Sequence, residues 1–406
     1  MRTSSSDKAT FFNLVNNYVG MVLLSMHYCF AQSGWLALLA LAALTGFGAF
    51  TGDCLVTSYR LIEADNPARA PSYAEIGGRC LGPAGKWLVV VSSLLENFFA
   101  ILCMIIIIWA NTQLLLPDMD PNWVVGLCVA FSFPTNWLKD FSLLSFLSAF
   151  GLGCVLLIIA VVTFDAGDAL LDPATPSAKT TLADVSGLPM SGSIMLAGLT
   201  GHVGLPPMYT EMKTPSHFRR VLYLAFLAMF LMYAAVGVGG YALYGDGASI
   251  LITQDMANAA GANDGLGQVF RYLVLGGITF KLFAGTPVCV LVLVDIVQDV
   301  YVERGHVLSE READRWRFGI WGGTIVCAFV LLPYLQYTTA LVGINSMLIS
   351  VMLPLIFFLQ LHARTMGWAS ILCYGCIIAV SGIMTVIISY ADVLDFLKTL
   401  KAAQAV

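Results

Sequence analysis

Long apolar runs with almost no charge constrain this chain more than any other feature of its sequence. Of its 406 residues, 58% are hydrophobic and only 11% are charged, so a water-soluble fold could not cover its apolar side chains. Windows of about 20 apolar residues, long enough to cross a bilayer as a helix, predict about eleven spans. They cover residues 11–33, 35–59, 86–114, 122–136, 143–163, 190–209, 220–244, 268–298, 318–337, 340–361 and 369–391. We therefore predict an all-α membrane protein with eleven transmembrane helices in a lipid bilayer. The sequence contains no basic block, so we expect no nucleic-acid partner.

The basic residues predict which side of the membrane each loop faces, because lysine and arginine gather on the cytosolic side. With a cytosolic N-terminus, the inner segments hold Arg2, Lys8, Arg60, Arg69, Arg79, Lys86, Lys139, Lys213, Arg219, Arg220, Arg304, Arg311, Arg315, Arg317 and Arg364. The outer segments hold only Lys179, Lys398 and Lys401. This asymmetry supports the predicted number of spans and their orientation together.

The rest of the chain indicates one membrane domain, over residues 11–391, between a cytosolic tail at 1–10 and a C-terminal tail at 392–406. The polar lead runs into an apolar segment without an A-x-A cleavage site, which favours a retained first span over a signal peptide. Most of the ten cysteines lie inside apolar runs, including the pair Cys373 and Cys376, so we expect packing rather than disulfides.

Two of the apolar segments contain residues that interrupt helices. The stretch LAGLTGHVGLPPMYTEMK at 196–213 holds glycines and a proline pair, and FNLVNNYVGMVLLSMHYCFAQSG at 12–34 holds asparagines and a glycine. Irregular backbone at membrane depth is tolerated only where protein covers it or where it lines a cavity. We therefore predict that helices 1 and 6 are discontinuous. Because they are five spans apart, we expect a five-plus-five inverted repeat, with repeats at about 11–163 and 190–361 and an extra helix at about 369–391.

The ends of interrupted helices predict the chemistry of a site between the repeats. The first N–H groups of a half-helix attract a carboxylate, while the carbonyls that face them suit an ammonium or a metal cation. An α-amino acid has both groups, and the residues at the breaks are the candidate substrate-binding set: Val19, Gly20, Met21, Val22, Ser25, Gly198, Thr200, Gly201 and His202. The alternative is that these glycines only allow close helix packing, which their spacing fits poorly.

Four motifs in order resemble those of the amino acid/auxin permease family, within the amino acid–polyamine–organocation transporters. The first span resembles the family's FNLxNAxxGxGxLxLPYAxxxxG, and PSYAEIGGRCLGPAGK resembles its TYxDIGxxxFGxxGR. GHVGLPPMYTEMKTPSHF resembles GHxxxPxIxxxMKxPxxF, and GYALYGD resembles GYxxFGD. The resemblance covers most of residues 11–361 and implies eleven spans and amino acid transport coupled to protons or sodium. The chain departs from the family at Val22 and His27, which add bulk near the expected carboxylate site and favour a small substrate or an unusual pocket.

Two charged residues lie in the middle of apolar spans, Glu96 in the third and Lys281 in the eighth. A charge at the centre of a membrane helix costs about 2.5–3.5 kcal/mol, so such residues face the bundle interior and either pair or titrate. One interpretation is a structural ion pair between Glu96 and Lys281. The other is that these residues couple transport to an ion.

The family resemblance bears on the choice of ion. Family members that use sodium resemble one another in having an asparagine in the first span and a hydroxyl group in the eighth span near the ion. Asn16 and Thr279 occupy similar positions in this chain. Lys281 lies two residues beyond Thr279, and its ammonium could stand where sodium would. We therefore expect the proton gradient to be the driving force, with Glu96 or Lys281 as the proton carrier and sodium as the alternative. Vesicular inhibitory amino acid transporters look similar around the glutamate of the third span, which favours protons.

Among the histidines and tyrosines, only His202 and His27 are candidates for a role at the transport site. His202 matches the family's GH at the second break and could act at the site or satisfy a helix end, whereas His27 has no such match and is expected to be structural. We expect Tyr209 and Tyr233 to be packing or interface residues.

These patterns favour a secondary active transporter that works by alternating access. A channel would need a continuous polar stripe, and an enzyme would need a metal-binding histidine pair, a carboxylate cluster or a G-x-S-x-G motif, which the sequence does not contain. A receptor with the same fold stays open as an alternative. We expect no cofactor and no metal, a monomer, and either the plasma membrane or a vacuolar or endolysosomal membrane.

Overall fold

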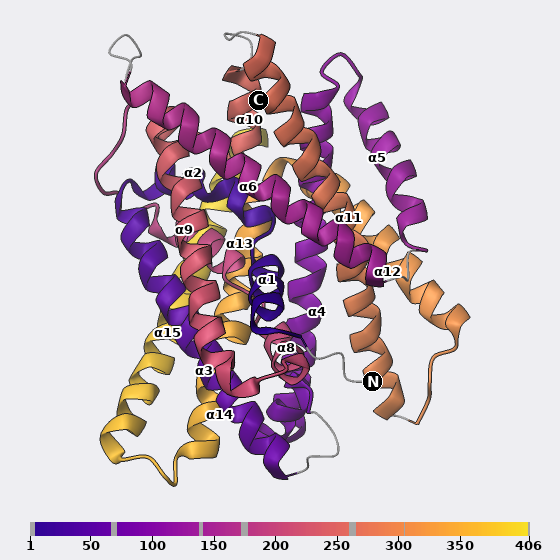
Figure 1. The fold of residues 1–406 in the computed structure, drawn as a ribbon, viewed down its shortest axis with the longest axis vertical. Helices are drawn as coiled ribbons and strands as arrows, with labels where there is room; N and C mark the ends of the chain where they lie inside the picture. The colour runs from indigo at the N-terminus through magenta and orange to yellow at the C-terminus, as the bar shows by residue number, and fades with distance from the viewer. Residues whose placement is uncertain are drawn as a thin grey trace.

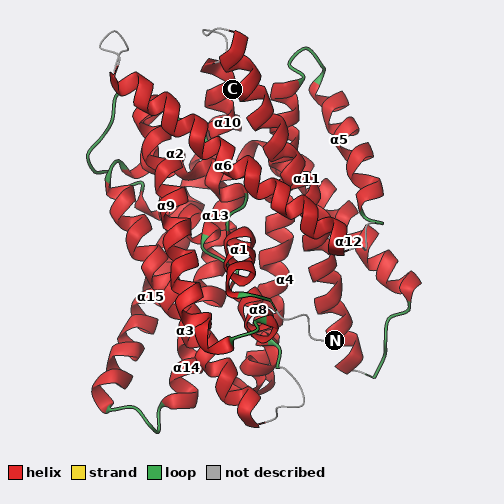
Figure 2. Ribbon diagram, in the orientation of Figure 1, coloured by secondary structure: helices red, strands yellow, loops and turns green. Residues whose placement is uncertain are grey.

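The computed structural model describes residues 5–65, 71–137, 141–171, 178–259, 265–303 and 305–404, and these parts form a bundle of helices (Figures 1 and 2). Within them no strand occurs, and seven helical stretches are long and apolar enough to cross a membrane. The all-α membrane class is therefore confirmed. Arg2, Arg69, Lys139 and Arg304 of the predicted inner side lie outside the described residues.

Most of the predicted spans coincide with continuous helices. These are α3 (Leu36–Asp65), α4 (Tyr73–Leu115), α5 (Pro121–Thr135), α6 (Phe141–Leu171), α9 (Phe218–Tyr244), α11 (Gly265–Glu303) and α15 (Trp368–Gln404). The ninth and tenth predicted spans fall in one helical stretch, made of α12 (Glu310–Leu331), a 3₁₀ turn at Leu332–Tyr334, α13 (Leu335–Ser346), the π-helix η7 (Met347–Met352) and α14 (Leu353–His362).

Three helices extend or interrupt the predicted pattern. A capping box between Ser72 and Glu75 begins α4 well before the predicted span, and the helix bends at Gly82, whose φ of 67° suits a residue without Cβ, followed by Pro83. A short helix, α10 (Ile252–Ala259), lies between the seventh and eighth predicted spans, where no helix was predicted. The helix α15 continues to Gln404 through much of the predicted C-terminal tail.

Both predicted interruptions are present. The first segment consists of α1 (Asp7–Tyr18), a 3₁₀ helix at Met21–Ser25 and α2 (Met26–Ser33). The second consists of α7 (Leu188–Gly198), a 3₁₀ turn at His202–Gly204 and α8 (Leu205–Glu211). In Figure 1, α1 and α8 lie beside each other near the middle of the bundle, where residues far apart in the sequence are in contact.

The segments predicted to share the inner side of the membrane contact one another. The backbone of Ser5 accepts from Lys213 and donates to the Glu211 carbonyl, each at 2.8 Å, and the Arg60 guanidinium donates to the Pro215 carbonyl at 3.0 Å. The chain before α1, the end of α3 and the α8–α9 connection therefore lie at one end of the bundle.

The segments predicted to be outer meet in the same way. The amide of Asp184 donates to the Ser33 carbonyl at 3.1 Å, and the Thr181 hydroxyl donates to Asp246 at 2.9 Å. The connections that follow α2, α6 and α9 thus lie together at the other end of the bundle. This is the arrangement expected if successive loops alternate between the two sides of the membrane.

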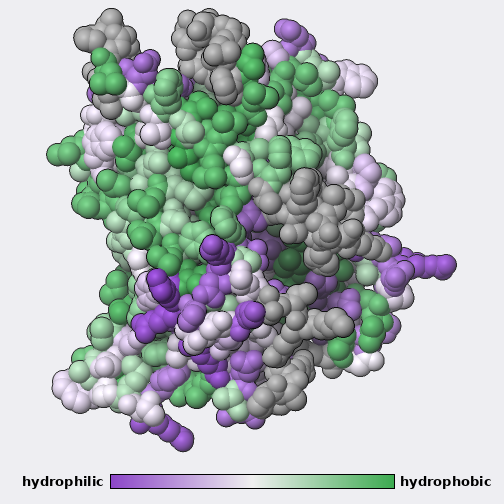
Figure 3. Space-filling view, viewed as in Figure 1, coloured by the Kyte–Doolittle hydropathy of each residue, from purple (hydrophilic) through white to green (hydrophobic). Residues whose placement is uncertain are grey.

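The surface agrees with a membrane environment. Figure 3 shows mostly hydrophobic side chains over the upper part of this face, with hydrophilic ones gathered lower down around α1 and α8. Large apolar side chains such as Phe164 (73% exposed) and Val386 (68% exposed) point away from the bundle, where lipid would cover them.

Candidate transport site

The first break lies between α1 and the 3₁₀ helix that follows it. Asparagine and glycine are weak helix formers, and α1 ends at Tyr18, after which Val19 is extended (φ −78°, ψ 96°). Its carbonyl consequently lacks the usual helical partner and accepts a hydrogen bond from the Lys281 ammonium, with Nζ 2.8 Å from the oxygen. A Cβ built on Gly20 meets no heavy atom within 4 Å, so there is open space beside this residue.

The second break follows Gly198, the last residue of α7. Gly201 has φ 144°, a value that side chains rarely allow, and the reversal leaves its carbonyl facing the first break. The Asn17 side-chain amide donates to that carbonyl at 3.3 Å, and this contact links the two breaks directly. A Cβ built on Gly201 would lie 2.7 Å from the amide nitrogen of Asn17, so only glycine fits here.

Tyr233 of α9 joins the two breaks, a role that its sequence context did not indicate. Its hydroxyl oxygen lies 2.8 Å from the Gly198 carbonyl and 3.1 Å from the Tyr18 carbonyl, and the side chain is fully buried. The single hydroxyl proton is therefore shared by the last carbonyls of α7 and α1. The sequence shows only a tyrosine in an apolar helix, which is typical of packing.

Glu96 of α4 meets the second break at Thr200. The Thr200 hydroxyl donates to Glu96 Oε1, and its oxygen also lies 3.2 Å from the Ser350 hydroxyl in η7. Glu96 is 6% exposed, and its Oε2 is buried with no hydrogen-bond partner among the described residues. A π-helix often marks a functional site, and here it presents Ser350 to this cluster. Nothing in the sequence singles out Ser350.

Glu96 and Lys281 do not pair with each other in the described structure. Each instead bonds to a different break, Glu96 to Thr200 and Lys281 to the Val19 carbonyl. The interpretation of these residues as a direct structural ion pair is therefore not what the structure shows.

His202 is held by hydrogen bonds on both ring nitrogens. Its Nε2 lies 3.2 Å from the Gly48 carbonyl and 3.1 Å from the Thr51 hydroxyl, and its Nδ1 lies 3.4 Å from the Tyr18 hydroxyl. Because a carbonyl only accepts, Nε2 carries the proton and Nδ1 accepts from tyrosine. The fully buried ring thus fastens the second break to α3 and α1.

The remaining predicted residues surround the breaks. Met21, Val22 and Ser25 are buried in the 3₁₀ helix, and Val22 Cγ1 lies 3.0 Å from a Cβ built on Gly198. Asn16 lies on α1, half-buried, two residues before its end. The Thr279 hydroxyl donates to the Leu275 carbonyl of its own helix at 2.7 Å.

A cavity of about 560 Å³ opens at the end of the bundle that holds the predicted inner loops. Its lining includes Tyr59, Ser93, Val203 and Thr210. Ser93 lies one helical turn before Glu96 on α4, and Val203 follows the second break, so the cavity approaches the site from this side.

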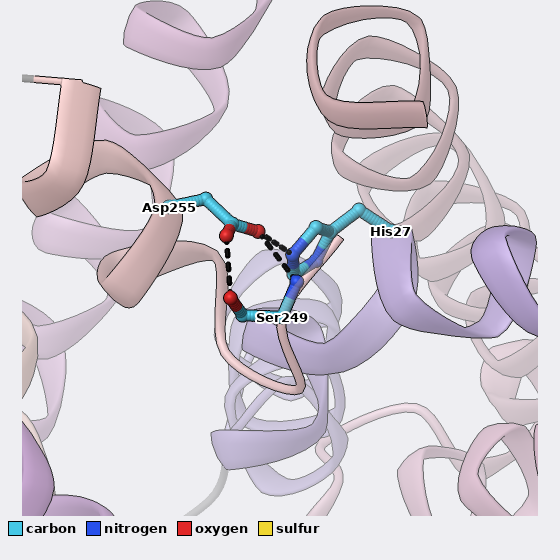
Figure 4. A network of polar contacts seen from close by, with 3 residues as sticks. All are labelled: His27, Ser249 and Asp255. Atoms are coloured by element: carbon cyan, nitrogen blue, oxygen red, sulfur yellow. Dashed lines mark hydrogen bonds and ion pairs between the residues drawn. The ribbon is translucent and has the colours of Figure 1, made fainter. Parts of the chain in front are cut away.

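A polar network around α10 lies on the side of the predicted outer loops (Figure 4). Asp255 lies between His27 of α2 and Ser249, accepting from His27 Nε2 at 2.9 Å, from the Ser249 hydroxyl at 2.6 Å and from its amide at 2.9 Å. Burial acts to raise the pKa of Asp255, but the hydrogen bonds from His27 and Ser249 outweigh it and lower the pKa below its ordinary value. The Nε2 of His27 therefore has a hydrogen-bond partner in Asp255, although its Nδ1 has none among the described residues.

The fold and the two linked breaks are those of a multi-helix membrane protein. Solved structures share this fold: a substrate-bound Na⁺-coupled sialic acid symporter has a TM-score of 0.57 at 11% identity, covering 93% of this chain and 88% of that one. MhsT in complex with L-phenylalanine has a TM-score of 0.50 at 11% identity, covering 94% and 98%.

Sequence comparison identifies the family. The model of the transmembrane amino acid transporter protein family matches residues 3–394, so the chain belongs to this family. It is 25% identical to amino acid transporter AVT1H of Arabidopsis thaliana, over 93% of this chain and 89% of the relative. It is 23% identical to the vesicular inhibitory amino acid transporter of Xenopus tropicalis, over 91% and 74% respectively.

Proposed function

We propose that this protein is a proton-coupled secondary active transporter of amino acids that works by alternating access. Membership of the amino acid transporter family supports the substrate class. The arrangement that carries the coupling proposal is the separation of the two intramembrane charges, with Glu96 on Thr200 at one break and Lys281 on the Val19 carbonyl at the other. In this proposal the chain has eleven spans arranged as two inverted repeats and an extra helix, and works as a monomer.

The open space beside Gly20 is where we place the amino acid. A carboxylate there would meet the first amides of the 3₁₀ helix that starts at Met21, and the ammonium would face the carbonyls of the second break. Val22 fills the space beside Gly198 at the second break, which favours a small side chain on the substrate.

The tethered ammonium of Lys281 supports protons over sodium as the coupling ion. It already supplies a compact cation to the Val19 carbonyl, an oxygen that sodium would otherwise seek. Glu96 is then the proton carrier, because it can hold or release a proton beside Thr200 while its second oxygen has no other partner among the described residues.

The inner cavity and the hydrogen-bonded outer network support an inward-facing state of the transport cycle in this proposal. In the opposite state, α10 would leave His27 and the inner half-helices α1 and α8 would close the cavity. We place the N-terminus in the cytosol, supported by the basic residues of the inner segments, and the protein in a vacuolar or endolysosomal membrane, supported by its vesicular relative.

Uptake into proteoliposomes tests the proposal. Amino acids offered against an imposed pH gradient should accumulate above equilibrium, and a sodium gradient alone should not drive them. Glu96→Gln should abolish the response to the pH gradient, while the exposed control Glu310→Gln at the start of α12 should keep it. A full response in Glu96→Gln would clear this residue of the role, accumulation with sodium alone would establish the alternative ion, and saturable binding without flux would indicate a receptor.

A further inference from the structure

Gly151 of α6 lies directly against the stem of Lys281 on α11. A Cβ built on Gly151 would be 2.5 Å from Lys281 Cγ, 2.8 Å from Cδ and 3.1 Å from Cβ. These are its three nearest heavy atoms, so the room left by the missing side chain is filled by the lysine and not by backbone. The stem runs through this gap to place the ammonium 2.8 Å from the Val19 carbonyl.

The contact belongs to a close approach of α6 and α11. One turn further along the same pair of helices, Cys154 Sγ lies 2.8 Å from a Cβ built on Gly277. Each helix thus contributes a glycine opposite a side chain of the other. The sequence shows these residues only as small ones inside apolar spans, where lipid-facing and packing glycines look alike.

We propose that Gly151 is the positioning residue that lets Lys281 reach the first break. Any side chain at position 151 would turn the lysine stem away, because the clash involves Cγ and Cδ, and would draw the ammonium off the Val19 carbonyl. The size of residue 151 therefore decides whether the tethered cation is held at the break. This inference rests on the proposed function, since it assigns Gly151 to coupling through Lys281.

A double-mutant cycle with a matched control tests the contact itself. Gly153 lies on the same helix, and a Cβ built there meets nothing within 4 Å, so Gly153→Ala carries the helix-propensity gain of alanine without the clash. Gly151→Ala should lower the melting temperature of the purified protein relative to Gly153→Ala. In a Lys281→Ala background Cγ and Cδ are gone and only the Cβ contact at 3.1 Å is left, so most of the difference between Gly151→Ala and Gly153→Ala should disappear.

The pH profile of uptake supplies a readout that ordinary packing would not move. Gly151→Ala should displace the profile in the same direction as Lys281→Ala, whereas Gly153→Ala should follow the wild type. If Gly151→Ala cannot be purified, recovery of folded protein in the Lys281→Ala/Gly151→Ala double variant supports the proposal, and its failure to fold overturns it.

The outcomes separate this inference from the proposed function. Equal melting-temperature changes for Gly151→Ala in both backgrounds would show that Gly151 serves general packing, and would overturn the inference whatever the uptake data show. Gly151→Ala could instead change the melting temperature only when Lys281 is present, while uptake shows no pH dependence in any variant. That result would keep Gly151 as the residue that positions Lys281 and would overturn proton coupling.

Discussion

Removing the hydroxyl of Tyr233 should loosen both breaks at once. In Tyr233→Phe the ring stays in its buried place, but the carbonyls of Gly198 and Tyr18 lose the donor that now lies 2.8 and 3.1 Å away. A buried acceptor left without a partner costs about 1–3 kcal/mol. Hydrogen bonds between membrane helices average about 0.6 kcal/mol and reach about 1.7 kcal/mol. Since a single proton serves two carbonyls, we expect a loss of about 1–2 kcal/mol.

Reversible unfolding of the purified protein in mixed micelles measures this loss as a change in the free energy of unfolding. Tyr390→Phe is the matched control, because Tyr390 lies on α15 with 67% of its surface exposed. Uptake by Tyr233→Phe should fall as well, since the ends of α1 and α7 would no longer be held to one another. A Tyr233→Phe protein as stable as Tyr390→Phe would refute the view that this hydroxyl ties the two breaks together.

Two further substitutions test other parts of the bundle. Gly343→Ala should destabilise the protein by about 1–3 kcal/mol or more in a thermal unfolding assay, because the new Cβ would lie 1.7 Å from the Ser193 backbone oxygen. Gly375→Ala is the control, because a Cβ built on Gly375 meets no heavy atom within 4 Å, and it should leave the stability unchanged. Asp255→Asn should weaken the outer network by about 1–3 kcal/mol at neutral pH. Because the folded-state pKa of Asp255 is lowered, its contribution is full above the ordinary value of 3.8 and is lost as the pH falls through the folded-state pKa. The difference in unfolding free energy between Asp255→Asn and the wild type should thus be constant near neutral pH and shrink only below about pH 4. A difference that disappears at higher pH would contradict the lowered pKa of Asp255.

The fold was predictable to the extent that it depends on local composition. Apolar length located the helices, and the glycines and prolines of residues 196–213 located the second break, because those residues disfavour a helix wherever they occur. The extension of α15 and the separate helix α10 were missed, since their polar or mixed sequences become helical through contacts with the bundle. Thr253 of α10, for example, donates to Asn111 of α4 at 2.8 Å.

The site was predictable only in its residue types. Glu96 and Lys281 were singled out because charge is costly in an apolar span, but whether they would pair depended on which backbone each could reach. Tyr233, Ser350 and Gly151 left no sequence signal, because a tyrosine, a serine or a glycine in an apolar helix is ordinary until its neighbour from another helix is known.

By itself the sequence determined that this chain enters a bilayer, where its helices are interrupted and which charges cannot face lipid. These are properties of single residues and their immediate neighbours, governed by transfer free energies and helix preferences. Only the tertiary structure decided that one tyrosine serves both breaks, that Glu96 bonds to Thr200, and that the Lys281 ammonium rests on the Val19 carbonyl. Those partners lie on different helices, and the distances between them are set by how closely the helices pack, which no local pattern encodes.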